Sequence, residues 1–160
     1  MQDLVKTLSE QLIKASKKLV TAESCTGGLI ASEITRLSGS SELFERGFVT
    51  YSNEAKQELL GVSKETLDHF GAVSEETAKE MAEGALKNSR ADIAASVTGI
   101  AGPSGGSDEK PIGTVCFGVC EKGKAAATST ERFNGSRHEV QDQAAKHALT
   151  IVLESLKSYS

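Results

Sequence analysis

The 160-residue sequence has few cysteines and no long hydrophobic run. Its three cysteines are an odd number without C-x-x-C spacing, so the sequence indicates neither a disulfide framework nor a zinc site. No stretch approaches the ~18 consecutive apolar residues of a membrane-spanning helix, and the first residues carry acids where a leader would be basic and then apolar. We therefore expect a protein that is neither exported nor membrane-spanning, and that works in the reducing cytoplasm.

Histidine is also scarce. The three that exist, His69, His138 and His147, each lie in a stretch that is typical of a surface helix. No H-x-x-x-H motif is present, and no cluster of two carboxylates with a histidine offers metal ligands. The sequence thus disfavours zinc-dependent hydrolysis, and we expect neither a metal ion nor a cofactor.

The charge balance is slightly acidic, with 18 Lys and Arg against 22 Asp and Glu and a net charge of -4. The basic residues are dispersed along the chain, whereas affinity for a phosphate backbone needs clustered Lys and Arg. This composition argues against a nucleic-acid partner.

Helical and strand patterns alternate along most of the chain. Apolar residues at helical spacing and N-cap residues predict helices at 3–17, 30–37, 52–60, 64–70, 75–89 and from 136 onward. Short β-prone runs predict strands at 19–22, 48–51, 91–98, 114–120 and 125–133, the last two as a hairpin around Lys122-Gly123-Lys124. The helix from 136 begins with a capping box, S-R-H-E.

These elements predict a layered α/β/α fold with a mixed, largely parallel sheet and one β-hairpin. The length fits one domain over residues 1–160. Sites in such sheets favour the strand ends, and the unusual residues gather there, at 23–28, 51–56 and 98–106.

A polar segment at 23–28, E-S-C-T-G-G, follows the first predicted strand and precedes a helix. Free N–H groups and the positive end of a helix at such a turn can hold a phosphate or an oxyanion. Ser24 presents its hydroxyl there and is a candidate nucleophile, which needs a base nearby. In a simpler interpretation, Thr26 only caps the helix and the two glycines only permit a tight turn.

Lys56 is the candidate base, because the histidines sit elsewhere and a lysine of lowered pKa replaces histidine in some serine sites. It lies about one helical turn beyond the second predicted strand, close to Tyr51. Ser52 is four residues from Lys56 and could form an alternative pair with it, although an N-cap explains Ser52 better. Cys25 competes with Ser24, since a thiolate at a helix N-terminus has a lowered pKa; its simpler interpretation is a small buried side chain.

A glycine-rich loop follows the strand at 91–98. Residues 98–113 hold five glycines and both prolines, which predicts a surface loop whose backbone can approach a ligand closely. The loop lacks the order of a P-loop. Arg137 stands in the first turn of the last helix, where a cation opposes the helix dipole and so suggests an anionic ligand; a plain exposed arginine explains it equally well.

Several long motifs stand in the same order as in a known family. They are A-E-S-C-T-G-G at 22–28, F-E-R-G-F-V-T-Y-S-N-E-A-K at 44–56, G-A-V-S-E at 71–75, T-G-I-A-G-P-S-G-G at 98–106 and E-K-P-I-G-T-V at 109–115. In these motifs the sequence resembles the CinA carboxy-terminal domain family over nearly its whole length, in a stand-alone form. Some members carry an additional amino-terminal domain, whose activities are not transferred to this sequence.

The resemblance implies a nicotinamide mononucleotide deamidase, which hydrolyses the carboxamide to nicotinic acid mononucleotide and ammonia in pyridine nucleotide salvage. In the implied mechanism Ser24 attacks the carboxamide, Lys56 accepts and returns the proton, and Tyr51 orients Lys56 or donates to the leaving ammonia. The residues expected to bind the substrate's phosphate or oxyanion are Thr26, Gly27, Gly28, Thr98, Gly99, Gly102, Gly105, Gly106 and Arg137. A homodimer is expected, since dimers are the commonest symmetric assembly.

Two alternatives stay open on the sequence. A non-catalytic nucleotide-binding module, regulatory in competence or DNA damage, would show every feature except the assignment of Ser24 and Lys56. Hydrolysis of the phosphate itself is a weaker alternative, because it usually needs acidic metal ligands.

Overall fold

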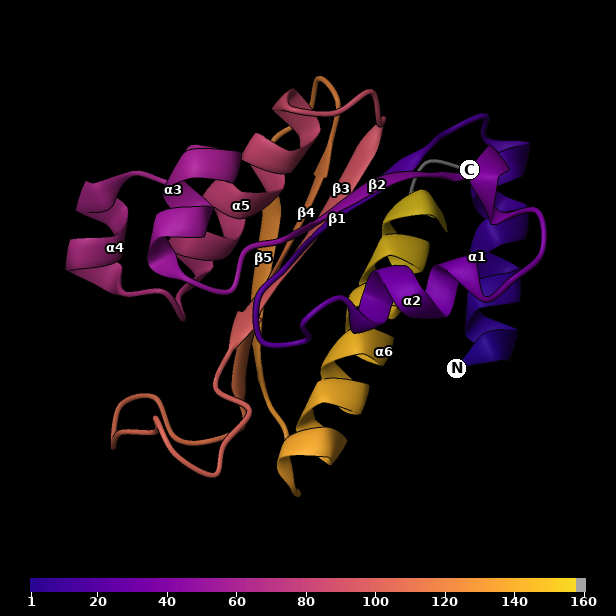
Figure 1. Ribbon diagram of the computed structural model, residues 1–160. Coiled ribbons are helices and arrows are strands. Elements are labelled where there is room, and N and C mark those ends of the chain that lie inside the picture. The colour runs from indigo at the N-terminus through magenta and orange to yellow at the C-terminus, as the bar shows by residue number, and fades with distance from the viewer. Residues whose placement is uncertain (158–160) are drawn as a thin grey trace.

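A five-stranded sheet separates two layers of helices in the computed structural model, which describes residues 1–157 (Figure 1). The strands lie in the order β2-β1-β3-β4-β5. Their bounds are Leu19–Glu23 for β1, Phe44–Val49 for β2, Ile93–Gly99 for β3, Thr114–Glu121 for β4 and Ala127–Arg132 for β5. The last three positions of the predicted domain, 158–160, lie outside the described residues.

The strand directions confirm the expected mixed sheet. Strand β1 pairs in parallel with β2 on one side and with β3 on the other. The hairpin partners β4 and β5 each pair antiparallel, β4 with β3 and β5 with β4, so four of the five strands run the same way. The sheet is therefore largely parallel in direction and ends in the predicted hairpin.

Strand β2 begins four residues before the predicted start at residue 48 and ends at Val49. Its register with β1 runs from Phe44 opposite Leu19 to Val49 opposite Glu23. The segment Glu45-Arg46-Gly47 hid this strand from the sequence pattern, because β2 lies at the sheet edge, where polar residues are exposed.

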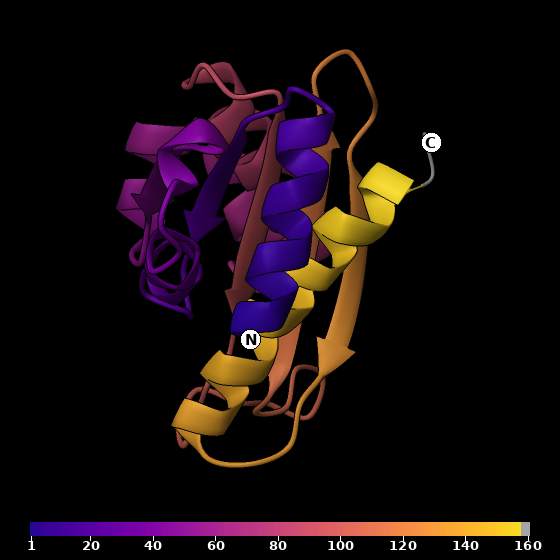
Figure 2. The same ribbon diagram turned by 90° about the vertical axis from the view of Figure 1, so that its right-hand side faces the viewer.

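The helices form one layer on each face of the sheet (Figures 1 and 2). Helices α1 (Gln2–Lys14), α2 (Leu29–Thr35) and α6 (Arg137–Lys157) cover one face, and α3 (Asn53–Leu60), α4 (Lys64–Phe70) and α5 (Glu75–Lys87) cover the other. A short 3-10 helix, Ser40–Glu42, was not predicted. The expected α/β/α layering is confirmed.

Serine side chains start the helices where the sequence predicted them. Ser52, Ser63 and Ser74 each accept a hydrogen bond from the amide three residues ahead. At the start of α6, the Ser136 amide donates to Glu139 at 3.0 Å and the Glu139 amide donates to the Ser136 hydroxyl at 3.3 Å. These contacts are the predicted capping box.

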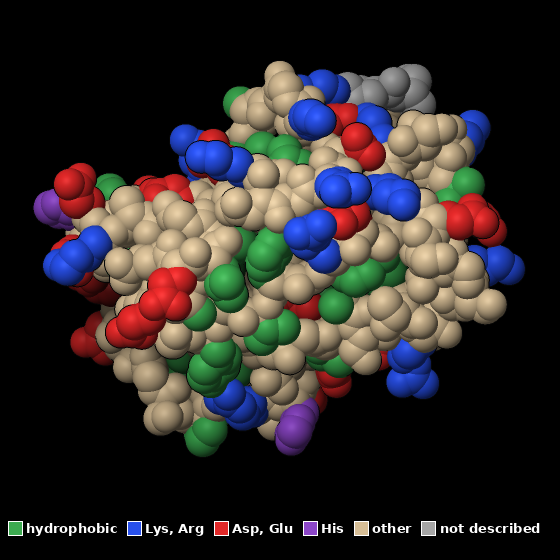
Figure 3. Space-filling model, turned by 45° about the horizontal axis from the view of Figure 1, so that its top comes forward, with side chains coloured by type: hydrophobic (Ala, Val, Ile, Leu, Met, Phe, Trp, Pro, Cys, Tyr) green, Lys and Arg blue, Asp and Glu red, His purple; other side chains and the backbone are tan. Residues whose placement is uncertain are grey.

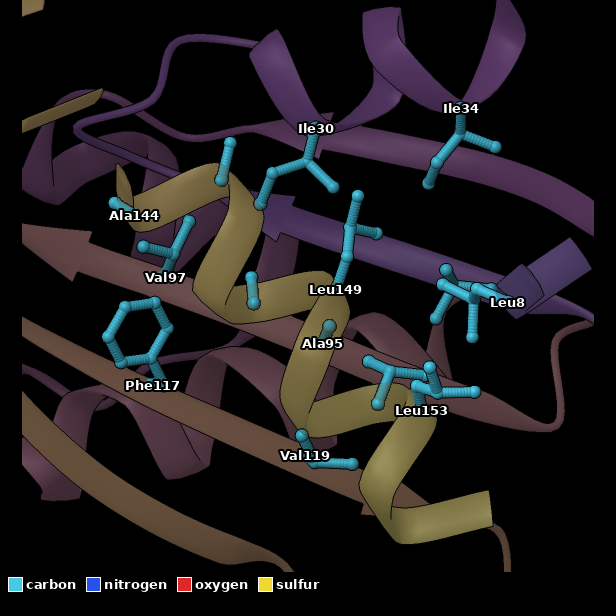
Figure 4. Packing of buried hydrophobic residues seen from close by; sticks show 14 of the residues in the cluster. Leu8, Ile30, Ile34, Ala95, Val97, Phe117, Val119, Ala144, Leu149 and Leu153 are labelled. Carbon is cyan, nitrogen blue, oxygen red and sulfur yellow. The ribbon is translucent and has the colours of Figure 1, made fainter. Parts of the chain in front are cut away.

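The larger hydrophobic core lies between the sheet and the α1, α2 and α6 layer (Figure 4). Leu149 and Leu153 on α6 face the sheet residues Ala95 and Val119, and Ile30 comes from α2 (Figure 4). A second core, on the α5 face, includes Val20, Ala22, Leu60, Met81, Ala82 and Ala94. Strand β1 is buried along its whole length, as a strand covered on both faces must be.

The chain order creates a crevice at one end of the sheet. From β1 the chain passes through α2 to β2 on one side, and from β2 it crosses through α3, α4 and α5 to β3 on the other side of β1. Ligands in open α/β sheets bind outside the carboxyl ends of the strands at such a switch point. The loop after β3 and the start of α6 lie at this same end in both ribbon views (Figures 1 and 2).

Charges of both signs mix on the surface that Figure 3 shows, where Lys and Arg alternate with Asp and Glu. Among the residues that the structure describes, no helix combines the length and the hydrophobicity needed to cross a membrane.

Gly84 provides a test of how α3 is held against α5. A Cβ at Gly84 would lie 1.8 Å from the backbone oxygen of Leu60, the last residue of α3. Gly→Ala inside a helix ordinarily stabilises by about 1 kcal/mol. Here we expect Gly84→Ala to lower the free energy of unfolding by about 1–3 kcal/mol in urea titrations. Lys79→Ala, at an exposed position of the same helix, should change it by less than about 0.5 kcal/mol; a gain of stability in Gly84→Ala would contradict the close packing.

Candidate active site

Ser24 and Lys56 meet in the crevice. Ser24 directly follows β1, and Lys56 lies in the first turns of α3. The Lys56 amine nitrogen lies 3.1 Å from the Ser24 hydroxyl oxygen, within hydrogen-bond distance. Both side chains are buried, with 1% of Lys56 and 7% of Ser24 exposed. The structure thus brings together the two residues that the sequence singled out as nucleophile and base.

The Lys56 amine has two further partners, both backbone carbonyls. It donates to the oxygen of Thr50 at 3.0 Å and to the oxygen of Tyr51 at 3.3 Å. A neutral amine has two N–H groups and one lone pair, so the two carbonyls can take both N–H groups and leave the lone pair facing Ser24. Burial lowers the pKa of Lys56, because the charged ammonium loses water there. The surroundings favour the neutral amine that a general base requires.

Cys25 is a buried neutral thiol. Burial raises its pKa to about 12, and only 5% of the residue is exposed. The expected lowering of a thiol pKa at a helix N-terminus does not occur here, because loss of water outweighs the hydrogen bond from the Cys25 amide and the nearby charges of Lys56 and Arg137. The structure favours Cys25 as a small buried side chain over Cys25 as a thiolate nucleophile.

The start of α2 is closed by Glu23, the last residue of β1. Its carboxylate accepts hydrogen bonds from the Thr26 hydroxyl at 2.6 Å, the Ile30 amide at 2.9 Å and the Ala31 amide at 3.1 Å. The sequence-based expectation of free amides at this helix end needs correction, since a fully buried carboxylate already occupies them. The Thr26 hydroxyl is likewise taken.

The turn between β1 and α2 keeps backbone amides available next to Ser24. The Gly27 amide donates to the Ser24 carbonyl at 3.0 Å, which closes the turn. Within residues 1–157 the backbone N–H groups of Cys25 and Thr26 meet no oxygen acceptor, and the Cys25 N–H has only its own thiol as a partner. Both residues are more than nine-tenths buried, and buried donors normally find partners. These two amides are available donors at the turn, whereas the amides of Gly27, Leu29, Ile30 and Ala31 already have acceptors.

A cavity of about 240 Å³ opens beside the Ser24–Lys56 pair. Its lining residues are Ser24, Cys25, Tyr51, Asn53, Lys56, Ala72, Val73, Thr98, Gly99, Ala101 and Arg137. A larger hollow of about 480 Å³ lies at the other end of the sheet and contains none of the predicted site residues. The smaller cavity is therefore the candidate active site.

Tyr51 and Arg137 lie at the mouth of this cavity. Arg137 donates to the Tyr51 hydroxyl at 3.1 Å and to the Gly102 carbonyl at 2.7 Å. Tyr51 is 63% exposed and reaches Lys56 only through its backbone carbonyl. The phenol was predicted to orient Lys56 or to donate to the leaving ammonia; the contact that Tyr51 makes with Lys56 comes from the main chain.

Not every predicted substrate-binding residue reaches the cavity. Thr98 and Gly99 line it, although the Thr98 hydroxyl donates to the Ala72 carbonyl at 2.8 Å. The other glycines do not line it; they are Gly27, Gly28, Gly102, Gly105 and Gly106. A Cβ at Gly102 or at Gly106 would come within 2.6 or 2.8 Å of Ile112, so close packing inside the loop requires these two glycines.

The histidines lie away from the cavity. His147 packs its ring against Phe117 with centroids 4.6 Å apart, so it is a packed residue and not the solvated one predicted. His138 is exposed at the start of α6, and His69 lies in the last turn of α4. In the described part of the chain no group of three or more His, Cys, Asp or Glu could hold a metal ion.

Three contributors to the site were missed by the sequence analysis. Glu23 stood inside a recognised motif, but its reach to the start of α2 depends on the fold. Asn53 belongs to another motif and lines the cavity from the start of α3. Gln141 donates from α6 to the Cys25 carbonyl at 3.0 Å; its position one helical turn beyond Arg137 was the only available signal.

The fold and the site together define an α/β domain in which a buried lysine amine meets a serine hydroxyl at a strand-to-helix turn. The chain belongs to the family described as the CinA C-terminal domain, whose model matches residues 1–156. The family resemblance read from the motifs is therefore confirmed.

Two kinds of relative match this chain. A putative competence-damage inducible protein of Caldicellulosiruptor saccharolyticus is 50% identical over 99% of the chain, but the chain spans only 38% of that protein's length. Nicotinamide-nucleotide amidohydrolase PncC of Escherichia coli K12 is 55% identical, and the match covers 89% of the chain and 88% of PncC. PncC is thus a protein of about the same length as this chain.

Solved structures show the same fold. The competence/damage inducible protein CihA of Agrobacterium tumefaciens superimposes with a TM-score of 0.94 and 43% identity, covering 98% of this chain and 94% of that chain. A CinA superfamily protein of Enterobacter cloacae superimposes with a TM-score of 0.92 and 39% identity. The match covers 97% of this chain and 91% of that chain. These structures confirm the predicted fold class.

Proposed function

We propose that this protein is a nicotinamide-nucleotide amidohydrolase, which converts nicotinamide mononucleotide and water to nicotinic acid mononucleotide and ammonia. The observation that carries the proposal is the 3.1 Å contact between the buried Lys56 amine and the Ser24 hydroxyl. A matched relative of comparable length bears the name of this activity. The smaller reacting part of the substrate, the carboxamide on its pyridine ring, suits the small cavity.

In the first half of the reaction Ser24 becomes acylated. Lys56 takes the proton of the Ser24 hydroxyl, and the oxygen attacks the carboxamide carbon, whose carbonyl oxygen becomes an oxyanion. When the carbonyl re-forms, the C–N bond breaks and Lys56 returns the proton to the nitrogen, which leaves as ammonia. The nicotinate is then held as an ester on Ser24.

In the second half a water molecule takes the place of ammonia. Lys56, neutral again, accepts a proton from the water as it attacks the ester. The bond to Ser24 breaks, the proton passes back to the Ser24 oxygen, and nicotinic acid mononucleotide leaves. One lysine therefore acts as base and as acid in each half of the cycle.

The amides of Cys25 and Thr26 are the proposed donors to the oxyanion. The Cys25 amide directly follows the nucleophile, as one oxyanion-hole amide does in serine hydrolases with a strand-to-helix turn. Neither N–H group has an oxygen acceptor in the described chain, so both are ready for a developing charge.

The phosphate is proposed to lie outside the cavity, near Arg137. A volume of about 240 Å³ is below the roughly 300–1,000 Å³ of sites that enclose a whole ligand. The guanidinium has five N–H donors and makes two hydrogen bonds to protein, which leaves donors for a phosphate. The Tyr51 hydroxyl accepts from this guanidinium, so we assign it to phosphate binding instead of proton transfer to ammonia.

A non-catalytic nucleotide-binding module is the alternative. A binding module would explain the arginine at the cavity mouth. It would not explain why the Lys56 amine is buried against a serine hydroxyl, because burial of an amine lowers stability and a binding module has no catalytic use for it. Hydrolysis of the phosphate itself is less favoured, since the residues described contain no acidic cluster that could hold a metal ion.

The finer features of the setting are also proposals. The three cysteines are unpaired thiols in the described structure, which suits a reducing cytoplasm. The interspersed charges and the net charge of -4 support the absence of a nucleic-acid partner. A homodimer remains the expected assembly, and the partner that the site itself calls for is a small nucleotide.

Ammonia release from nicotinamide mononucleotide tests the serine scheme. Ser24→Ala and Lys56→Ala should each reduce kcat by roughly three orders of magnitude or more, because nucleophile and base act as one unit. Cys25→Ala should retain most of the activity. Circular dichroism melts check that each variant is folded. An active Ser24→Ala with an inactive Cys25→Ala would instead identify a thiol amidase, and saturable binding without ammonia in the unmodified protein would identify a binding module.

The pH dependence of kcat/KM tests the role of Lys56. Catalysis needs the neutral amine, and burial lowers the pKa of this lysine from 10.5. We expect kcat/KM to rise with pH as Lys56 loses its proton, with a midpoint below 10.5. Lys56→Arg should be inactive at every pH, since a guanidinium stays charged. A midpoint at or above the ordinary lysine value would count against a buried base.

Arg137→Ala tests the phosphate position. Phosphate binding is largely shared by the ground and transition states, so its loss should raise KM by about tenfold or more and change kcat little. Arg36→Ala, which removes an exposed arginine at the end of α2, is the matched control and should leave both constants unchanged. An unchanged KM in Arg137→Ala would place the phosphate elsewhere.

A further inference from the structure

Gln141 joins helix α6 to the turn that carries the nucleophile. Its side-chain amide donates to the Cys25 carbonyl at 3.0 Å, across 116 residues of sequence. Gln141 is half-buried, and this is its one hydrogen bond through the side chain within residues 1–157. The contact is therefore tertiary and specific to one peptide group.

The peptide that Gln141 holds links Cys25 to Thr26. In a planar trans peptide the carbonyl oxygen and the following N–H point in opposite directions. A hydrogen bond that draws the Cys25 carbonyl toward α6 thus turns the Thr26 N–H away from α6. That N–H is one of the two amides without an oxygen acceptor beside Ser24.

The two preceding peptides are fixed separately. The carbonyl of the Ser24–Cys25 peptide accepts from the Gly27 amide at 3.0 Å, and the N–H of the Glu23–Ser24 peptide donates to the Val97 carbonyl at 3.0 Å. Without Gln141, no hydrogen bond would hold the orientation of the Cys25–Thr26 peptide, whereas the two peptides before it would keep theirs. Peptide rotation at this position would remove an oxyanion donor and leave the serine in place.

We propose that Gln141 is a positioning residue, which holds the Cys25–Thr26 peptide so that its N–H stabilises the oxyanion. The inference rests on the proposed amidohydrolase function. It assigns to α6 a part in the chemical step, in addition to the part of Arg137 in phosphate binding. Gln141 itself does not touch the substrate.

Gln141→Met tests the proposal, because methionine keeps the side-chain length and removes the donor. Gln143→Met is the matched control: Gln143 is exposed on the same helix and donates only to nearby carbonyls, those of Asn134 and Glu139. Gln141→Lys restores a donor long enough to reach the Cys25 carbonyl. The readouts are kcat, KM for nicotinamide mononucleotide, and the melting temperature.

We expect Gln141→Met to lower kcat by roughly 10–100-fold, somewhat less than full loss of an oxyanion donor, with KM within about threefold. Gln141→Lys should recover most of kcat, and Gln143→Met should match the unmodified protein. An unchanged kcat in Gln141→Met would overturn the proposal. A kcat equally low in Gln141→Lys would also overturn it, because the donor would then not matter.

Amide hydrogen exchange separates failure of this inference from failure of the proposed function. If the unmodified protein releases no ammonia, the amidohydrolase proposal fails. The positioning role is then judged from exchange in a peptide spanning 23–28. Faster exchange there in Gln141→Met, but not in Gln143→Met, supports the anchoring of this turn, and unchanged exchange overturns it.

Discussion

The burial of the Lys56 amine is the constraint on which the rest of the site depends. An ammonium in that position would lose nearly all of its water, so its pKa is lowered and the neutral amine is favoured. The carbonyls of Thr50 and Tyr51 accept its two N–H groups, and the remaining direction faces Ser24. Lysine usually lies at the surface, but here its amine is buried at the end of the sheet and faces a serine hydroxyl.

That position requires both helical layers. Lys56 comes from α3, which packs against α5 at Gly84, and Ser24 sits on a turn tied to the opposite layer. Glu23 fixes the start of α2, and Gln141 fixes the Cys25 carbonyl from α6. Ser24 and Lys56 are thus supported from opposite faces of the sheet, each by contacts within its own helical layer.

Much of the fold could be predicted from local patterns. Serine N-caps at Ser52, Ser63 and Ser74 and the capping box at Ser136 marked helix starts correctly, because capping is a contact between near neighbours. The edge strand β2 was misplaced, since its polar residues carry no alternating pattern. The prediction of free amides at the start of α2 was wrong for a related reason. The Glu23 carboxylate that accepts from these amides comes from the preceding strand, and only the folded turn brings it to the helix.

The sequence by itself determined the fold class, the family and the candidate pair of Ser24 and Lys56, because motifs and periodicity are properties of short stretches of chain. Tertiary structure decided what that pair can do. Burial of the amine, neutrality of the Cys25 thiol and the choice of available amides all depend on which atoms surround each group. Desolvation and hydrogen-bond satisfaction are set by neighbours from distant parts of the chain, and these come together only in the folded protein.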